Sequence, residues 1–431
     1  MAPREQIYEL LAGDDEGRVC RDVPESACRE QPRNFLTHAA TLALTKTGDG
    51  FVDPKLVLAW LLGALGAPAA ATGMLVPVRE ALALLPQLAT AGAIRRMPRR
   101  KWVWVAGSLV QGLCVLAMAL VAVAMEGAAA GWTIVALVAG FALGRSLCSV
   151  SYKDVLGKTV SKGHRGTAIG SGSSVAAAAV LILGAALSTG VIPLSVTSVA
   201  VLLACGGATW IAAAALFATL PEEPGATGGG GNALQVAHEQ VALLREPQLF
   251  RFIVTRSLLV GTALAPPYFM AIAGERASGG IGELGPFVLA SSIASMVSAY
   301  VWGRLSDRSS RMVLVLSGLC AAAILGLVAG LSLVEPQWAR TPLVLAAALF
   351  GLMIAYQGVR RGRSTHIVDM APASQRAAYT ALSNTAVGLV LVLGGGFGFV
   401  SDAIGPEAVL AIFAAMCLAG AAFAATLEEA Q

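Results

Sequence analysis

The chain has 431 residues, of which 56% are hydrophobic and 13% are charged, and its formal net charge is +4. Soluble domains carry about 25% charged residues, so this composition excludes an ordinary soluble domain and is typical of a membrane protein. Of the seven cysteines, only Cys20 and Cys28 lie outside apolar runs. They lack CxxC spacing, and a zinc site needs four well-spaced ligands, so no metal site is predicted.

Apolar segments dominate the chain after a polar start. Residues 1–34 carry charges of both signs without a sustained period, which predicts a loosely ordered cytoplasmic tail. Twelve apolar segments follow, each close to the ~20 residues that a helix needs to cross a bilayer. We predict spans at about 35–62, 70–93, 102–125, 131–152, 166–189, 194–219, 249–273, 284–303, 313–334, 341–361, 377–400 and 406–427.

A polar stretch rich in glycine and proline separates the sixth span from the seventh and is typical of a flexible linker. The sequence therefore predicts an all-α membrane protein with twelve transmembrane helices in two six-helix bundles. The first bundle covers residues 35–219 and the second covers 249–427. Residues 220–248 form the predicted cytoplasmic linker between them.

The basic residues orient these spans. With the N-terminus inside, 23 of the 30 Lys and Arg residues fall in cytoplasmic segments, and only Arg276 and Arg340 fall in outside loops. The positive-inside rule then places both termini in the cytoplasm. The first apolar run begins only near Phe35, so no cleavable signal peptide is predicted. We expect an integral multi-pass protein of the bacterial cytoplasmic (inner) membrane.

One short polar segment, residues 303–312 (GRLSDRSSRM), joins two apolar runs. Two long apolar helices joined by so few residues are antiparallel neighbours, so this segment lies at a membrane face. Its pattern G-R-L-S-D-R-x-S-R resembles the signature loop between helices 2 and 3 of each half of the major facilitator superfamily. The resemblance implies twelve helices in two pseudo-symmetric halves around a central cavity, and alternating access. It also implies that Gly303, Asp307 and Arg311, with Arg308 beside them, latch the cytoplasmic side shut in the outward-facing state.

The first half carries a weaker version of the same loop at residues 92–101. Aligned on Gly92, Arg96 stands where the second half has Asp307, so the acidic residue is missing. We place Gly92 and Arg96 among the candidate gating residues. A second correspondence supports two related halves, because the pairs Arg145/Asp154 and Arg360/Asp369 both have a spacing of nine residues.

An ionisable residue in mid-membrane costs several kcal/mol, so each one is a functional candidate. Span 1 contains Lys46, Asp49 and Asp53 at spacings i, i+3 and i+7, which predicts that they share one helical face. Two glycines and Pro54 weaken the helix there, and interrupted helices often supply transporter sites. The resemblance implies that helix 1 lines the cavity and that proton-coupled members use an acid there. The alternative is a Lys46–Asp49 pair that only holds helices together.

Span 2 carries Arg79 and Glu80 near its midpoint. Adjacent residues do not face each other on a helix, so they cannot both point at one partner. We expect Glu80 near Lys46 and Arg79 near Asp49 or Asp53, which gives a charge network between helices 1 and 2. The alternative is that these buried charges are a static specificity device.

Span 4 carries Arg145, which resembles the arginine that drug/proton antiporters place in helix 4 and use in proton relay. The alternative is that Arg145 extends its charged end toward the cytoplasm. Span 5 lacks the proline of the antiporter G-P-x-x-G-G pattern, and this departure disfavours drug export. The basic loop at residues 95–101 is explained by the positive-inside rule and by contact with membrane lipid, so no nucleic acid partner is predicted.

The motifs of nucleotide-binding, serine-hydrolase and metalloprotease sites are absent, so neither an enzyme nor a bound cofactor is predicted. We predict a secondary active transporter that moves a small anionic or zwitterionic solute, coupled to protons or another ion. Asp49 or Asp53, with Glu80, would bind and release a proton or counter-charge, while Lys46, Arg79 and Arg145 would tune that acid or hold an anionic solute. The alternative is a transporter-like sensor or scaffold that binds a ligand without moving it. Export and uptake both stay open.

Overall fold

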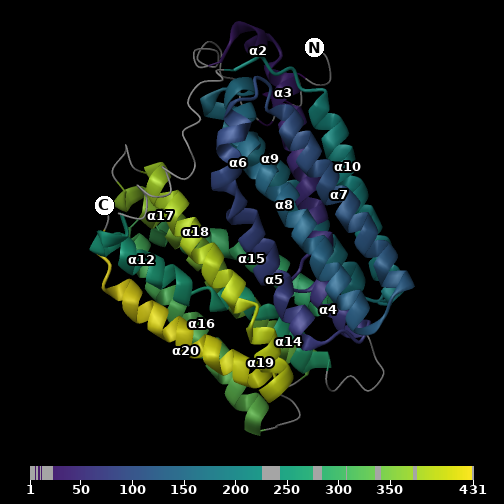
Figure 1. Cartoon of the computed structure of the whole chain (residues 1–431), viewed down its shortest axis with the longest axis vertical. Coiled ribbons are helices and arrows are strands. Elements are labelled where there is room, and N and C mark those ends of the chain that lie inside the picture. The colour runs from purple at the N-terminus through teal and green to yellow at the C-terminus, as the bar shows by residue number, and fades with distance from the viewer. Residues whose placement is uncertain are drawn as a thin grey trace.

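A computed structural model describes residues 23–225, 243–274, 284–306, 308–334, 341–371 and 376–429, preceded by Glu5, Tyr8, Glu9 and Leu11. These residues form helices and turns, with no β-strand among them. Figure 1 shows most of the helices running side by side along the long axis of the molecule. We call its two ends the α2 side and the α4 side, after the helices that lie there (Figure 1).

The helices of the first half are α2 (Glu25–Arg29), α3 (Gln31–Phe51), α4 (Val57–Ala64), α5 (Ala69–Leu84), α6 (Pro86–Arg95), α7 (Lys101–Ala124), α8 (Gly127–Thr159), α9 (Lys162–Ser188) and α10 (Val196–Ala218). The second half contains the 3₁₀ turn η1 (Leu243–Arg245), α12 (Pro247–Leu258), α13 (Gly261–Leu264), α14 (Pro266–Gly274), α15 (Leu284–Ser306), α16 (Ser310–Val334), α17 (Pro342–Met370), α18 (Arg376–Gly394), α19 (Phe397–Ile404) and α20 (Pro406–Ala425).

Every predicted span is helical, but four of them are divided. Span 1 consists of α3 and α4, and the break contains Pro54. Proline lacks a backbone N–H and disfavours the helical conformation of the residue before it, so the helix stops there. Span 2 consists of α5 and α6, and Pro86 opens the second helix. Span 7 consists of α12, α13 and α14, and Pro266 opens the last of these. Span 11 consists of α18 and α19, which are separated by Gly395 and Gly396.

Nine helical stretches of the described residues are long and apolar enough to cross a membrane. They correspond to predicted spans 3 to 7 and 9 to 12. Spans 1 and 2 are interrupted and charged, and span 8 contributes the shorter apolar stretch Leu284–Ser298. The architecture is therefore an all-helical, multi-pass membrane fold, as the sequence predicted.

The end of the predicted N-terminal tail is helical, because α2 and the first turn of α3 precede residue 35. This turn packs on the α2 side against the junction of α8 and α9. The Gln31 amide donates to Ser161 Oγ at 2.7 Å, and the Asn34 amide donates to the Thr159 carbonyl at 3.1 Å. Buried His38 bonds the Thr159 hydroxyl at 2.8 Å. Residues of the tail before 23 lie largely outside the described part of the chain.

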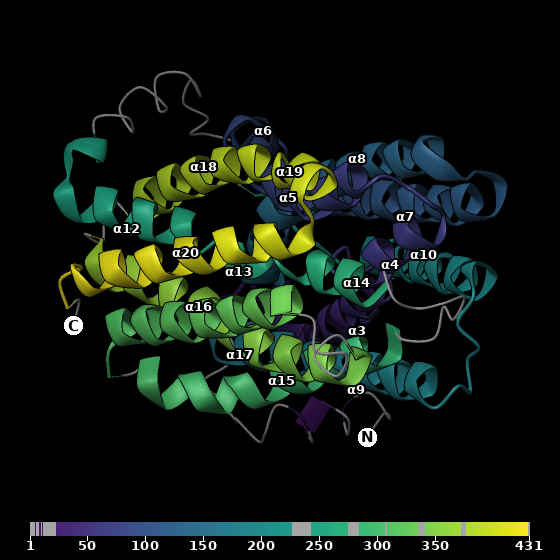
Figure 2. The same ribbon diagram turned by 90° about the horizontal axis from the view of Figure 1, so that it is seen from below.

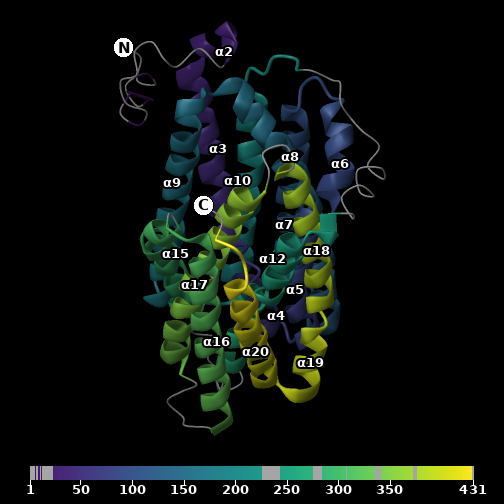
Figure 3. The same ribbon diagram turned by 90° about the vertical axis from the view of Figure 1, so that its left-hand side faces the viewer.

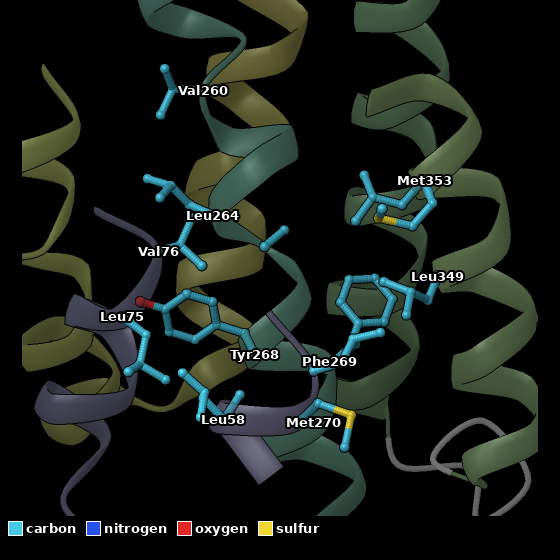
Figure 4. Packing of buried hydrophobic residues seen from close by; sticks show 14 of the residues in the cluster. Leu58, Leu75, Val76, Val260, Leu264, Tyr268, Phe269, Met270, Leu349 and Met353 are labelled. Atoms are coloured by element: carbon cyan, nitrogen blue, oxygen red, sulfur yellow. The ribbon is translucent and has the colours of Figure 1, made fainter. Parts of the chain in front are cut away.

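Several pairs of helices join the two halves. In particular, α4 packs against α14, α5 packs against α18 and α19, and α9 packs against α15 (Figures 1, 2 and 3). Figure 4 shows the apolar part of this contact, where Leu58 and Leu75 of the first half lie beside Tyr268 and Met270 of α14. All four side chains are buried.

One close approach between the halves lies on the α4 side, between α5 and α19. A Cβ atom added to Gly73 would lie 2.5 Å from the Cα of Gly398, so only glycine permits this contact. One turn away, the Asp402 carboxylate accepts hydrogen bonds from the backbone N–H groups of Ala69 and Ala70 at 3.0 and 2.9 Å. An acidic group from the second half thus caps the N-terminus of α5 in the first half.

Candidate functional site

Asp49 of α3 lies at the centre of a group of charged side chains contributed by three helices. Arg145 of α8 places its Nη1 atom 2.8 Å from each oxygen of the Asp49 carboxylate. Arg79 of α5 places its Nη2 atom 2.9 Å from Asp49 Oδ1. Two guanidinium groups therefore share one carboxylate, whose side chain is 18% exposed. We call Lys46, Asp49, Arg79, Glu80 and Arg145 the charge cluster.

Glu80 contacts the neighbouring residue Arg79, with its Oε1 atom 3.2 Å from Arg79 Nη1. The expectation that Glu80 lies near Lys46 is wrong, because Lys46 donates to the Ser173 hydroxyl of α9. The rule that adjacent helical residues diverge fails here because both side chains are long enough to bend back toward each other. The predicted pairing of Arg79 with Asp49 is present.

Asp53 lies outside the charge cluster, because α3 ends at Phe51. Its carboxylate accepts hydrogen bonds from the backbone N–H groups of Lys55 and Leu56 at 2.7 and 3.1 Å. The prediction that Asp53 shares a helical face with Lys46 and Asp49 is therefore wrong. Asp53 instead holds the turn that separates α3 from α4.

Sequence reasoning missed Lys55, which lies in the same break and is only 6% exposed. Its Nζ atom is 3.5 Å from the ring centroid of Tyr356, on α17 of the second half. The Arg360 guanidinium also faces this ring, at 5.8 Å from the centroid. Tyr356 therefore joins a lysine of the first half to an arginine of the second half through cation–π contacts. The signal available in the sequence was a lysine within a predicted span, directly after Pro54.

Positive charge exceeds negative charge around the charge cluster. Arg360 is close enough to Lys46 to repel it electrostatically, as Arg145 also does. Glu80 is attracted by Lys55 and by Arg363 in addition to Arg79. The acidic side chains Asp49, Asp53 and Glu80 are thus outnumbered six to three by the basic side chains Lys46, Lys55, Arg79, Arg145, Arg360 and Arg363. The imbalance favours an anion in this region.

A cavity of about 270 Å³ lies between α3, α7, α8 and α10 and reaches the charge cluster. Its lining combines charged, polar and aromatic side chains. It is lined by Leu42, Thr45, Lys46, Asp49, Trp104, Ser108, Gln111, Arg145, Cys148, Ser149, Tyr152, Lys153 and Trp210. Ligand pockets for drug-sized molecules start near 300 Å³, so this cavity suits a small solute.

The predicted gating residues that the structure describes lie on the α2 side. Arg96 is an exposed residue at the end of α6, and Arg308 is exposed before α16. Gly92 lies within α6 and Gly303 lies within α15, while Asp307 lies outside the described residues. Arg311 pairs with Glu429 beyond α20, at 2.7 Å.

The equivalent position in the first half holds a residue that sequence reasoning missed. Glu222, beyond α10, has a fully buried side chain. Its carboxylate accepts hydrogen bonds from the backbone N–H groups of Arg100 and Lys101 at 3.0 and 2.8 Å, and from Lys158 Nζ at 3.1 Å. Glu222 therefore caps the start of α7 and joins three helices. Its position in a polar stretch after a span gave no signal of burial.

Comparisons with known proteins identify the fold. The crystal structure of the nucleoside transporter NupG superposes with a TM-score of 0.67 at 14% identity, over 91% of this chain and 98% of that chain. A D-xylose-proton symporter superposes with a TM-score of 0.67 at 12% identity, over 92% of this chain and 98% of that chain. A variant of the peptide transporter POT in complex with sulfate superposes with a TM-score of 0.68 at 13% identity, over 96% of this chain and 97% of that chain. No curated protein sequence matches this chain.

The sequence profile of the Major Facilitator Superfamily matches residues 41–359 and, in an overlapping second match, residues 290–430. Together these matches cover nearly all the helices of both halves. The protein is therefore a transporter rather than an enzyme, and it is embedded in a membrane by many helices. The chain belongs to the major facilitator superfamily of secondary transporters.

Proposed function

We propose that this protein transports a small anionic or zwitterionic solute and couples its movement to a proton carried by Asp49. The observation that carries the proposal is the sharing of one carboxylate by Arg79 and Arg145, at 2.8 to 2.9 Å. Both guanidinium groups can bind a carboxylate or phosphate group through paired hydrogen bonds. Asp49 and a solute anion would thus compete for the same donors.

The protonation state of Asp49 determines whether Asp49 or the solute binds the two arginines. When Asp49 is ionised, it neutralises one of the two arginines and occupies their donors. When Asp49 takes up a proton, its negative charge disappears and both guanidinium groups are left to bind a solute anion. Loss of the proton restores the carboxylate, which then displaces the anion. Because protonation increases as the pH falls, solute binding should strengthen toward acidic pH.

Glu80 supports this exchange by keeping Arg79 in place, with a contact of 3.2 Å. When Asp49 is neutral, Glu80 still anchors one side of the Arg79 guanidinium, so the group keeps its orientation. Lys46 and the second-half arginines add positive charge around the solute. Structures with a similar fold include a transporter in complex with 5-aminolevulinic acid, which is a zwitterion, and one in complex with sulfate.

We further propose that the α2 side faces the cytoplasm of a bacterial inner membrane, with both termini inside. The distribution of basic residues supports this orientation. The Gly73–Gly398 contact and the Asp402 cap close the α4 side, which would then be the outer side. The structure would therefore correspond to a state open toward the cytoplasm. In the opposite state, Gly92, Arg96, Gly303, Asp307, Arg308 and Arg311 would help to close the α2 side.

Alternating access would move residues 35–219 against residues 249–427, with residues 220–248 as the connection. Both directions of transport are compatible with a proton exchanged at Asp49. Uptake would use the inward proton gradient by symport, whereas export would use it by antiport. The sign of the pH gradient that drives solute accumulation in vesicles decides between them.

The test is transport into proteoliposomes that contain the purified protein, with labelled organic acids and amino acids as candidate solutes. Asp49→Asn should remove the acceleration by an imposed pH gradient, because asparagine binds no proton. Asp53→Asn is the matched control, because asparagine can still accept the hydrogen bonds of the turn. Binding of a solute without translocation would overturn transport. An unchanged pH dependence in Asp49→Asn would overturn the proton site.

A further inference from the structure

The second half contains a buried arginine without an acidic partner. Arg256 of α12 is 6% exposed. Its guanidinium donates to the Ser383 hydroxyl and, at 3.1 Å, to the Asn384 side-chain oxygen, both on α18. Its Nε atom is buried without a hydrogen-bond partner, and no described carboxylate forms an ion pair with it. A buried charge with only neutral partners is costly, because nearby dipoles replace only part of its hydration.

The position of Arg256 repeats the position of Asp49. Asp49 lies two residues before the end of α3 at Phe51, and Arg256 lies two residues before the end of α12 at Leu258. Each helix is the first segment of a divided span that opens its half of the molecule. The same place in the fold thus carries an acid with two arginines in one half and an unpaired arginine in the other.

A second cation acts on Arg256 electrostatically. Arg363 of α17 is close enough to repel it electrostatically, and it also attracts Glu80 of the charge cluster. Positive charge therefore extends from α12 through α17 to the charge cluster of the first half. Asn384 is only partly buried, so this group of side chains is not sealed within the second half. An anion here would be attracted by two arginines and could accept a hydrogen bond from the Nε–H group of Arg256.

We propose that Arg256, Ser383 and Asn384 form an oxyanion-binding subsite in the second half, which takes the carboxylate or phosphate group of the transported solute. This inference rests on the proposed transport of an anionic solute, and it assigns the anion a partner in each half. The bound anion would supply the counter-charge that Arg256 lacks. The Ser383 hydroxyl and the Asn384 amide would add donors once the anion displaces their present contacts.

The experiment measures thermal unfolding of the purified protein in detergent with millimolar inorganic phosphate or succinate, against sodium chloride at equal ionic strength. We expect both oxyanions to raise the unfolding temperature of the wild-type protein. Arg256→Gln should weaken the apparent affinity roughly ten- to a hundredfold, because it removes charged hydrogen bonds. Arg251→Gln, on the exposed side of the same helix, is the matched control and should leave the affinity unchanged.

Asn384→Asp provides a second variant that does not remove the arginine. The new carboxylate would pair with Arg256, so the unliganded protein should be more stable and the oxyanions should no longer stabilise it. If Asn384 had only a structural role, the oxyanion effect would persist in this variant. General salt effects act equally on all variants, so differences between them isolate the subsite.

Two results would overturn the subsite. One is a wild-type protein that neither phosphate nor succinate stabilises, and the other is a wild-type response in both Arg256→Gln and Asn384→Asp. Asp49→Asn frees Arg79 and Arg145, so it should strengthen the oxyanion effect while it loses pH-dependent transport. The two proposals therefore fail in different measurements. The proton site fails if Asp49→Asn keeps pH-dependent transport, and the subsite fails if the second-half variants keep the wild-type stabilisation by oxyanions.

Discussion

The two halves bury their charges differently. In the first half, Asp49 compensates Arg79 and Arg145, and Glu80 adds a second carboxylate. In the second half, Arg256 is held only by neutral groups. Asp49 and Arg256 each lie two residues before the end of the first helix of a divided span, so related positions in the two halves carry opposite charges. Arg79 and Arg145 of the first half thus have a carboxylate partner, whereas the buried arginine of the second half has none among the described residues.

Removal of Arg79 should have the largest effect on stability. Arg79→Ala leaves Glu80 and Asp49 with fewer positive partners, and breaking such a buried pair costs about 3 to 5 kcal/mol. Arg256→Ala should cost much less, because no acidic group loses its partner. Chemical unfolding in mixed micelles measures both. The double variant Arg79→Ala/Glu80→Ala should recover part of the loss, and equal losses for Arg79→Ala and Arg256→Ala would contradict the comparison.

The α2 side offers a second comparison, between Glu222 and Glu429. The Glu222 side chain is fully buried and accepts from three donors, so Glu222→Ala should cost about 2 to 3 kcal/mol. Glu429 pairs with Arg311, but its side chain is 34% exposed. Solvent screening reduces such pairs to about 0 to 1 kcal/mol, so Glu429→Ala should have little effect. A larger loss of unfolding free energy in Glu429→Ala than in Glu222→Ala would contradict this comparison.

The sequence predicts the fold well because the bilayer imposes simple constraints. Apolar runs of sufficient length and the distribution of basic residues locate the spans and divide the chain into halves. The pairing of Arg79 with Asp49 was also predictable, since a mid-membrane arginine needs an acid on a neighbouring helix. These inferences depend on composition and local spacing alone.

The other features of the site could not be predicted, because they depend on where helices end and on contacts between segments that are distant in the sequence. Helical spacing grouped Asp53 with Asp49, but Pro54 ends the helix and turns the Asp53 carboxylate toward the backbone. Lys55 meets Tyr356, three hundred and one residues away in the chain, so no local pattern reveals their contact. Glu222 is buried only because α7 and α8 fold around it.

A smaller effect should follow from Asp402, which caps α5 across the two halves. Asp402→Ala removes two hydrogen bonds to backbone N–H groups, which costs about 1 kcal/mol and changes the ratio of the two conformations roughly fivefold. The state closed on the α4 side should become less populated. Spin labels at exposed Val191 and Val334 would report the separation of the halves on that side. An unchanged distance distribution would show that the cap does not set the balance.

The contact of Lys55 with Tyr356 should have the smallest effect and tests how the halves communicate near the charge cluster. Tyr356→Leu removes the ring and should weaken the contact by about 1 kcal/mol, while Tyr356→Phe retains the ring and should change little. Because the ring contacts Lys55 from the first half and Arg360 from the second, its loss would leave these cations less constrained. Transport by Tyr356→Leu should therefore slow severalfold while its pH dependence, set by Asp49, stays unchanged. A loss of pH dependence in Tyr356→Leu but not in Tyr356→Phe would instead place the ring within the proton pathway and extend the charge cluster into the second half.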